Sequence, residues 1–144
     1  DRLAPDLGES NKQRPWHIGV DKPIDDAAAA NRELQLVLAL REGALATSGN
    51  YRRFYVVDGK KYSHTINPRT GYPVQQDILG ASVYAPTCME ADAYATAFMV
   101  LGTEEAKRIV KDNPHLEACF IYQNKQGERE VWMSDRLKTL VLEE

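Results

Sequence analysis

The sequence predicts an α+β protein in which an antiparallel sheet has helices packed on it. Segments with strand character occupy both ends of the chain, and two helical segments follow one another between them. Short turns at Asp58-Gly59 and at residues 125–127 join neighbouring strands. Strands joined by short turns pair antiparallel, whereas parallel strands need long crossover connections. We therefore expect one domain over residues 1–144 rather than a βαβ series.

Composition narrows the function classes. The chain has 144 residues, 18 Lys and Arg, 21 Asp and Glu, and a formal net charge of −3. Its 43% hydrophobic and 27% charged residues are ordinary for a globular protein and exclude a low-complexity chain. The slight excess of acid argues against nucleic acid as the main partner, because that partner needs a basic face. No apolar run approaches the ~20 residues of a membrane span.

The first third of the chain predicts a lead-in and three short segments of strand. Residues 1–14 are polar and indicate an extended lead-in. Residues 16–20 predict a strand that ends at the turn signal of residues 21–23. Residues 33–40 alternate polar and apolar in their first half, which favours a strand, although leucine and alanine also suit a helix. Residues 43–50 predict a short strand and a turn.

A β-hairpin is the strongest local prediction of the middle region. Residues 54–57 and 61–66 have strand character and flank Asp58-Gly59. An Asp-Gly pair between two such runs is a strong hairpin signal. The second run leads into residues 67–73, where Pro and Gly fix the backbone and prevent further ladder pairing.

Two helices follow, and each has recognisable ends. Thr87 and Glu90 form a capping box, and the helix that they begin stops at Gly102. A second helix starts at Thr103, with acids in its first turn, and ends at residues 113–114. Further strands are expected at residues 78–85, 117–123 and 129–133.

The first helix contains a candidate metal pair. Asp92 and Thr96 stand four positions apart and therefore share one helix face. A carboxylate and a hydroxyl are hard oxygen ligands of the kind that Mg²⁺ takes. Spacing alone favours the simpler interpretation, an exposed aspartate on a helix that packs by its alanines.

The hairpin region contains a candidate acid or base. His64 stands just before the loop of residues 67–73, and histidine exchanges protons near neutral pH. Spacing alone again favours a simpler role, a hydrogen bond within the turn. The basic pairs Arg52-Arg53 and Lys60-Lys61 are typical of a solvated strand edge, and a phosphate contact is the alternative.

Several common site motifs are missing from the sequence. It contains no glycine-rich nucleotide-binding loop, no nucleophile elbow and no His-Glu-x-x-His zinc motif. Cys88 and Cys119 show no Cys-x-x-Cys spacing. We expect two buried free thiols rather than a disulfide, since free cysteine is often buried.

Three motifs together resemble the ApbE family of FAD:protein FMN transferases. They are TSGNYR at residues 47–52, SHTINPRTGYP at residues 63–73 and EADAYATA at residues 90–97, the last followed by VLG at residues 100–102. Their order and spacing are those of the family. The resemblance covers nearly all of the chain from about Arg14 onward.

The resemblance implies a reaction and a set of site residues. The family transfers the FMN part of FAD to a threonine or serine hydroxyl of an acceptor flavoprotein and releases AMP. Matched by position, Asp92 and Thr96 are the Mg²⁺ ligands and His64 is the catalytic histidine. Ile66, with His64 and Thr65 beside it, is expected to contact FAD. The implied fold is the T-fold-like architecture of the family.

Two departures from the family pattern limit these expectations. Asn67 stands where the family more often has Asp. The substitution argues against an acid role for this position, but it does not argue against the turn geometry. The chain is also less than half as long as the family's usual members and is similar to their C-terminal portion. We therefore expect it to be inactive alone and to self-associate through the face that the missing half leaves.

Other expectations follow from the resemblance only. The family's usual location is the periplasm or the outer face of the bacterial inner membrane, with a lipid anchor on the full-length protein. The alternative functions are an FAD pyrophosphatase, which passes FMN to water, and a flavin-binding domain without turnover.

Overall fold

The computed structural model describes residues 14–22, 34–50, 54–74 and 77–142. Apart from Arg14, the lead-in expected at residues 1–14 lies outside the described residues. The elements in chain order are β1 (Trp16–Asp21), β2 (Leu34–Leu40), β3 (Ala44–Gly49), β4 (Phe54–Val57), β5 (Lys60–Ser63), β6 (Ile78–Ala85), α1 (Cys88–Leu101), α2 (Thr103–Asp112), β7 (Glu117–Gln123), β8 (Arg129–Met133) and α3 (Asp135–Lys138).

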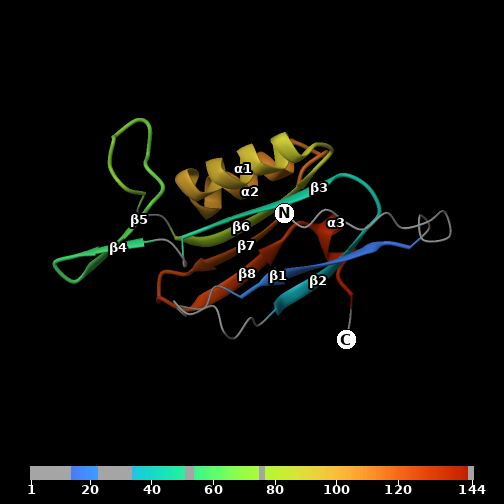
Figure 1. Ribbon diagram of the computed structural model, residues 1–144, viewed down its shortest axis with the longest axis horizontal. Coiled ribbons are helices and arrows are strands. Elements are labelled where there is room, and N and C mark those ends of the chain that lie inside the picture. The colour runs from blue at the N-terminus through green and yellow to red at the C-terminus, as the bar shows by residue number, and fades with distance from the viewer. Residues whose placement is uncertain (1–13, 23–33, 51–53, 75–76, 143–144) are drawn as a thin grey trace.

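A four-stranded antiparallel sheet forms the centre of the fold (Figure 1). Its strand order is β3-β6-β7-β8, and each pair of neighbours is antiparallel. The central strands β6 and β7 are buried along most of their length, whereas β3 and β8 form the two edges. The predicted α+β class with an antiparallel sheet is confirmed.

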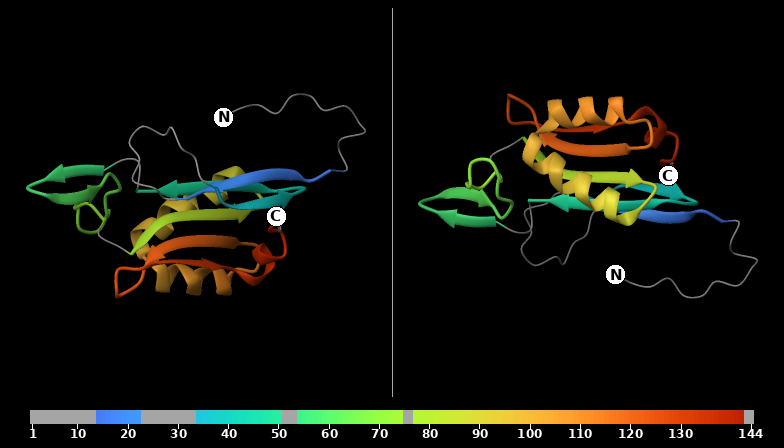
Figure 2. Two further views of the ribbon diagram at one scale, coloured as in Figure 1. Left: turned by 90° about the horizontal axis from the view of Figure 1, so that it is seen from below. Right: turned by 90° about the horizontal axis from the view of Figure 1, so that it is seen from above.

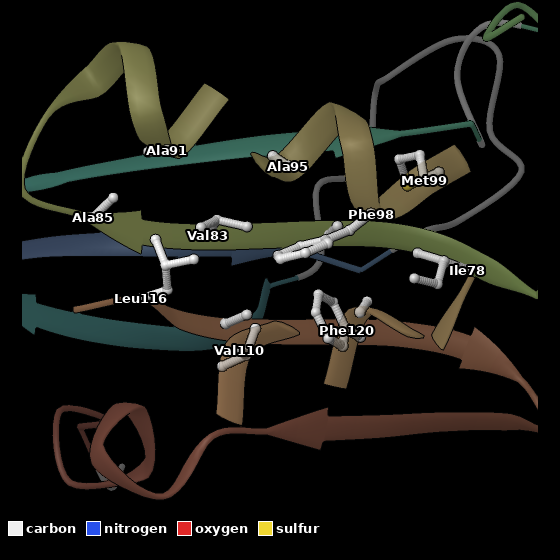
Figure 3. Packing of buried hydrophobic residues seen from close by; sticks show 13 residues of the cluster. Ile78, Val83, Ala85, Ala91, Ala95, Phe98, Met99, Val110, Leu116 and Phe120 are labelled. Carbon is white, nitrogen blue, oxygen red and sulfur yellow. The ribbon is translucent and has the colours of Figure 1, made fainter. Parts of the chain in front are cut away.

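Helices α1 and α2 cover one face of this sheet (Figure 1), and a row of aromatic side chains, of which Figure 3 labels Phe98 and Phe120, lies between the layers. Phe98 of α1 meets Phe120 of β7 edge to face, with ring centroids 5.3 Å apart. Phe120 stacks on Trp132 at 5.2 Å, and Tyr94 extends the row from the helix side. Such pairs stabilise by about 0.5–1.5 kcal/mol beyond the area that they bury. The row fixes α1 against the middle of the sheet.

The β1–β2 ribbon packs against the opposite face of the sheet, so that the main body has three layers (Figure 1). Val20, Leu38 and Leu40 form a buried cluster with Cys119 of β7 and Leu137 of α3. The alternation in β2 therefore indicated a strand with one buried face, and the helical alternative is excluded for Leu34–Leu40. Helix α3 was not predicted, because its four residues are too few to show a helical period.

The β4–β5 hairpin projects beyond the end of the main sheet (Figures 1 and 2). Its turn residues Asp58 and Gly59 have φ values of 50° and 75°, as a type I′ turn requires. Strand β5 ends at Ser63, earlier than the predicted residue 66. The reason is that Ile66 pairs with Pro73 inside the following loop instead of continuing the hairpin ladder.

The predicted helix ends are confirmed. The Thr87 hydroxyl accepts a hydrogen bond from the Glu90 backbone N–H at 3.3 Å, which is the N-cap half of the predicted capping box, and the Glu90 carboxylate pairs with His115. Gly102 has a φ of 85°, which favours glycine, and there α1 ends and α2 begins. Among the described helices, none has the length and apolar character needed to cross a membrane.

Both cysteines are free, as expected, but only Cys119 is buried. The prediction of two buried thiols is wrong for Cys88, which is exposed. Cys88 is the first residue of α1 and lies past the end of β6 at Ala85, where the sheet no longer covers it. Burial in the sheet raises the pKa of the Cys119 thiol to about 12.

Candidate functional site

Helix α1 presents Asp92 and Thr96 on its exposed side. The neighbouring Ala91 and Ala95 are completely buried against strands β3 and β6 (Figure 3). Because these alanines are small, the helix backbone approaches the sheet closely. The four-residue spacing then places both oxygen-bearing side chains together on the outer surface of the helix. The predicted sharing of one helix face agrees with this arrangement.

A third oxygen-bearing side chain joins this pair from the edge of the sheet. Ser48 Oγ of β3 lies 3.1 Å from Thr96 Oγ1, within hydrogen-bonding distance. Strand β3 is an edge strand, so the group of Ser48, Asp92 and Thr96 lies along an open border of the sheet. We call these three residues the oxygen cluster. Ser48 belongs to the first sequence motif but had no predicted role.

Hydrogen bonds at Asn67 fold the loop that follows His64. The Asn67 backbone N–H donates to Tyr72 O at 2.9 Å, and its carbonyl accepts from Gly71 at 2.8 Å. Its side-chain Oδ1 accepts from the Arg69 N–H at 2.9 Å. Asparagine here closes the turn as an aspartate would, because both side chains offer this acceptor oxygen. The expectation that Asn67 preserves the turn geometry is confirmed.

This loop and helix α1 enclose an open cleft of about 430 Å³. The lining residues are Asn67, Pro68, Arg69, Ala97, Val100 and Leu101. Its wall on the helix side begins one position after Thr96, at Ala97. The cleft is mainly apolar, and Arg69 supplies the one charged side chain among the described residues that line it.

The predicted flavin-contacting residues directly precede the loop that lines this cleft. His64 is exposed, Thr65 is half-buried and Ile66 is 50% exposed. Among the residues that the structure describes, the lining of the cleft includes neither these three nor the oxygen cluster. The structure therefore brings the loop against α1, while His64 and Asp92 both lie outside the lining of the cleft. Their roles stay predictions.

The chemistry of the oxygen cluster fits a magnesium ion. Within the described ranges, no three or more His, Cys, Asp or Glu side chains gather as a metal site. Mg²⁺ does not need such a cluster, because it binds through one or two carboxylates, several waters and substrate phosphates. The Asp92 carboxylate and the Thr96 hydroxyl supply donors of this hard type.

Other candidate residues fall outside the site. His115 had no predicted role, and its Nε2 lies 2.7 Å from Glu90 Oε1 near the start of α1. Arg52-Arg53 lie outside the described residues. Lys60-Lys61 belong to β5, and their phosphate contact stays a prediction.

Comparison of the sequence with known proteins gives a consistent result. The model of the ApbE family matches residues 6–120. An Escherichia coli K12 protein named FAD:protein FMN transferase is 37% identical over 139 residues, which cover 95% of this chain and 37% of that protein. A protein of the same name from Treponema pallidum is 35% identical over 125 residues, covering 87% of this chain and 33% of the relative.

Solved structures agree with the sequence comparison. The ApbE protein of Thermotoga maritima superimposes with a TM-score of 0.73 at 30% identity, covering 91% of this chain and 40% of that one. The flavin transferase ApbE of Vibrio cholerae gives a TM-score of 0.70 at 31% identity, covering 88% and 38%. The chain thus spans well under half the length of the relatives that it matches.

Proposed function

Since the chain belongs to the ApbE family, we propose that it is part of an enzyme that transfers FMN from FAD to a protein hydroxyl. The observation that supports this proposal best is the position of the oxygen cluster. Two of its members, Asp92 and Thr96, lie on α1. Thr96 directly precedes Ala97, where the helix begins to line the cleft whose other wall is the loop that follows His64. The relatives' name gives the donor, FAD, and the transferred group, FMN. Because these relatives are much longer than this chain, we infer that the chain contains only part of the site.

The proposed reaction is a phosphoryl-group transfer. A threonine or serine hydroxyl of the acceptor protein attacks the FMN phosphorus, and a new phosphoester bond forms. The bond from that phosphorus to the bridging oxygen breaks, and AMP leaves with the bridging oxygen. Because such transfers need positioning and charge neutralisation, the protein need not form a covalent intermediate.

The chain's own residues have three roles in this scheme. Asp92 and Thr96 would hold Mg²⁺, which when bound offsets negative charge on the pyrophosphate. His64 accepts the proton of the attacking hydroxyl or orients a phosphate oxygen. Ile66 and Thr65, which follow His64 in the sequence, contact the flavin nucleotide.

Substitution of Asp92 tests the metal assignment. We expect Asp92→Ala in the full-length protein to abolish Mg²⁺-dependent FMN transfer, measured by flavin fluorescence of the acceptor protein after denaturing electrophoresis. The fold should survive, because Asp92 is exposed and alanine is the better helix former. Asp112→Ala is the matched control, since Asp112 is an exposed aspartate on the neighbouring helix. Retained transfer by Asp92→Ala at saturating Mg²⁺ would refute the assignment.

Substitution of His64 separates catalysis from binding. We expect His64→Ala to slow transfer by about 10²–10⁴-fold, as proton transfer is commonly worth. FAD affinity, measured by calorimetry, should change much less. If affinity collapses while the rate at saturating FAD is unchanged, His64 is a binding residue.

An assay without acceptor protein distinguishes transferase from pyrophosphatase. Incubation of the full-length protein with FAD and Mg²⁺ alone should leave FAD largely intact. Rapid release of FMN and AMP would instead favour hydrolysis. Binding of FAD with no turnover in either assay would favour a flavin-binding domain.

The proposed location rests on the sequence resemblance. We place the full-length protein in the periplasm or on the outer face of the inner membrane, held there by a lipid anchor. Fractionation of cells, together with radiolabelled palmitate, measures both features. Recovery of unlabelled protein in the cytosolic fraction would contradict the assignment.

A further inference from the structure

The hydrogen bond between Ser48 and Thr96 joins two elements that lie far apart in the sequence. Ser48 belongs to edge strand β3, and Thr96 lies in the third turn of α1. Their hydroxyl oxygens are 3.1 Å apart, and either one can donate. Because Thr96 is exposed, water could satisfy its hydroxyl equally well. The bond is therefore not required to satisfy a buried polar group.

The alternation of β3 explains why Ser48 reaches the helix. Successive strand side chains point to opposite faces of a sheet. Ala44 and Ala46 pack under the helices, so Ser48 points to that same face. Thr47 points the other way, and its Oγ1 lies 2.8 Å from Ser82 Oγ of β6. Two hydroxyl pairs thus lie on opposite faces of β3, and only the Ser48–Thr96 pair belongs to the oxygen cluster.

The chemistry of a hydroxyl ligand determines which hydroxyl of the Ser48–Thr96 pair donates the hydrogen bond. A neutral hydroxyl that binds a cation does so through an oxygen lone pair, and its hydrogen must then be donated elsewhere. Ser48 Oγ is an acceptor at the required distance. With the hydrogen of Thr96 directed toward β3, the lone pairs of its oxygen are directed away from the strand.

The hydrogen bond to Ser48 competes with a hydrogen bond that Thr96 could make within its own helix. Inside a helix, a threonine hydroxyl commonly bonds a backbone carbonyl three or four residues earlier, and its side chain divides between two rotamers. For Thr96, the carbonyl four residues earlier is that of Asp92. The bond to Ser48 instead favours the rotamer that directs the hydroxyl toward β3.

We propose that Ser48 is a positioning residue that holds the Thr96 hydroxyl in the orientation needed to bind Mg²⁺. This inference rests on the proposed function, because it takes Asp92 and Thr96 as the metal ligands. Ser48 acts through Thr96 and needs no contact with the cation. Hydrogen-bond partners that orient metal ligands commonly change metal affinity by about 10–100-fold when they are removed.

The test compares cation affinities in the full-length protein. Mn²⁺ is the spectroscopic probe, and free Mn²⁺ is measured by electron paramagnetic resonance in the presence of FAD. We expect Ser48→Ala to weaken Mn²⁺ binding by about 10-fold, the lower end of the range for such partners. Ser48→Thr, which keeps the hydroxyl, should bind nearly as tightly as the unmodified protein. Equal affinity of Ser48→Ala and the unmodified protein would overturn the inference.

Thr47→Val is the matched control. It removes a hydroxyl–hydroxyl bond from the same strand but on the opposite face. Its unfolding temperature should fall at least as much as that of Ser48→Ala. Its Mn²⁺ affinity should stay within about twofold of that of the unmodified protein. A loss of affinity in Thr47→Val equal to that in Ser48→Ala would overturn the inference, because general weakening of β3 would then explain both.

A double substitution shows whether Ser48 acts through Thr96. If it does, adding Ser48→Ala to Thr96→Val should not weaken Mn²⁺ binding further. An additional loss of about 10-fold would mean an independent contribution and would contradict the positioning role. The proposed function fails separately: in that case Asp92→Ala and Thr96→Val would themselves leave Mn²⁺ affinity unchanged.

Discussion

The carboxylate of Asp77 caps helix α2 from outside the helix. Asp77 Oδ1 accepts a hydrogen bond from the backbone N–H of Thr103 at 2.9 Å. The residue at the N-cap position, Gly102, has no side chain that could do so. Thr103 is 1% exposed, so its N–H is poorly placed to bond water. Asp77 therefore ties the segment before β6 to the junction of the two helices.

Loss of this cap should destabilise the protein measurably. We expect Asp77→Ala to lower the free energy of unfolding by about 1 kcal/mol, as for other lost helix caps. Urea denaturation followed by circular dichroism measures the difference. Asp77→Asn keeps an acceptor oxygen and should retain most of the stability. A loss in Asp77→Asn as large as in Asp77→Ala would show that the hydrogen bond is not the source.

The two thiols should differ sharply in reactivity. Cys88 is exposed and should react with a disulfide reagent such as DTNB in the native protein. Cys119 should react only on unfolding, because burial excludes the reagent and raises its thiol pKa to about 12. Titration in buffer and then in denaturant counts one thiol and then two. Cys88→Ser should abolish the native reaction, and two thiols reacting at equal rates in buffer would contradict the burial of Cys119.

The Tyr122–Glu130 pair should contribute stability that depends on pH. The Tyr122 hydroxyl donates to Glu130 Oε2 at 2.7 Å, and this bond is the main cause that lowers the pKa of Glu130 below 4.5. A lowered pKa in the folded state means stability that is present above 4.5 and is lost as the pH falls through the lowered value. Tyr122→Phe should therefore be destabilising at neutral pH and progressively less so in acid.

Two measurements check this prediction. Urea unfolding of both proteins across the acid range gives the stability difference, and carbon-detected NMR gives the pKa of Glu130, which should rise in Tyr122→Phe. Tyr72→Phe is the control, since the Tyr72 side chain is 74% exposed. A stability difference that stays constant with pH would argue that ring packing, not the hydrogen bond to the carboxylate, is responsible.

The isolated chain should bind FAD poorly and should self-associate. Its oxygen cluster lies at an open sheet edge, and a dinucleotide needs a concave site that buries most of its surface. Trp16 and Ile18 of β1 are 48% and 37% exposed, and this apolar surface favours association. Calorimetric titration of FAD with and without Mg²⁺, together with light scattering, measures both properties. Tight metal-dependent binding by a monomer would contradict the prediction.

Features that depend on neighbouring residues could be predicted from the sequence. The Asp58-Gly59 turn and the Thr87 cap each depend on a few consecutive residues, so the hairpin and the start of α1 were correctly predicted. The pairing of β3 with β6 joins distant segments, and no local pattern specifies it. The same holds for the layer in which the β1–β2 ribbon packs.

The candidate site divides in the same way. The spacing of Asp92 and Thr96 requires them to share a helix face once the helix is known. The role of Ser48 could not be derived, because it depends on which strand lies beneath α1. The exposure of Cys88 depends on where β6 ends relative to the helix, which is also a tertiary property.

The projecting β4–β5 hairpin makes the His64 segment a separate unit of local unfolding. Its strands pair with each other, apart from the four-stranded sheet, and a lone two-stranded hairpin is only marginally stable in water. Amide hydrogens of this arm should therefore exchange with solvent through local opening, long before those of β6 and β7. Any ligand that holds His64 in place must also offset the conformational entropy that the arm loses when it becomes ordered. If FAD is the ligand, as we propose, part of its intrinsic binding energy is used to order the arm and does not contribute to affinity.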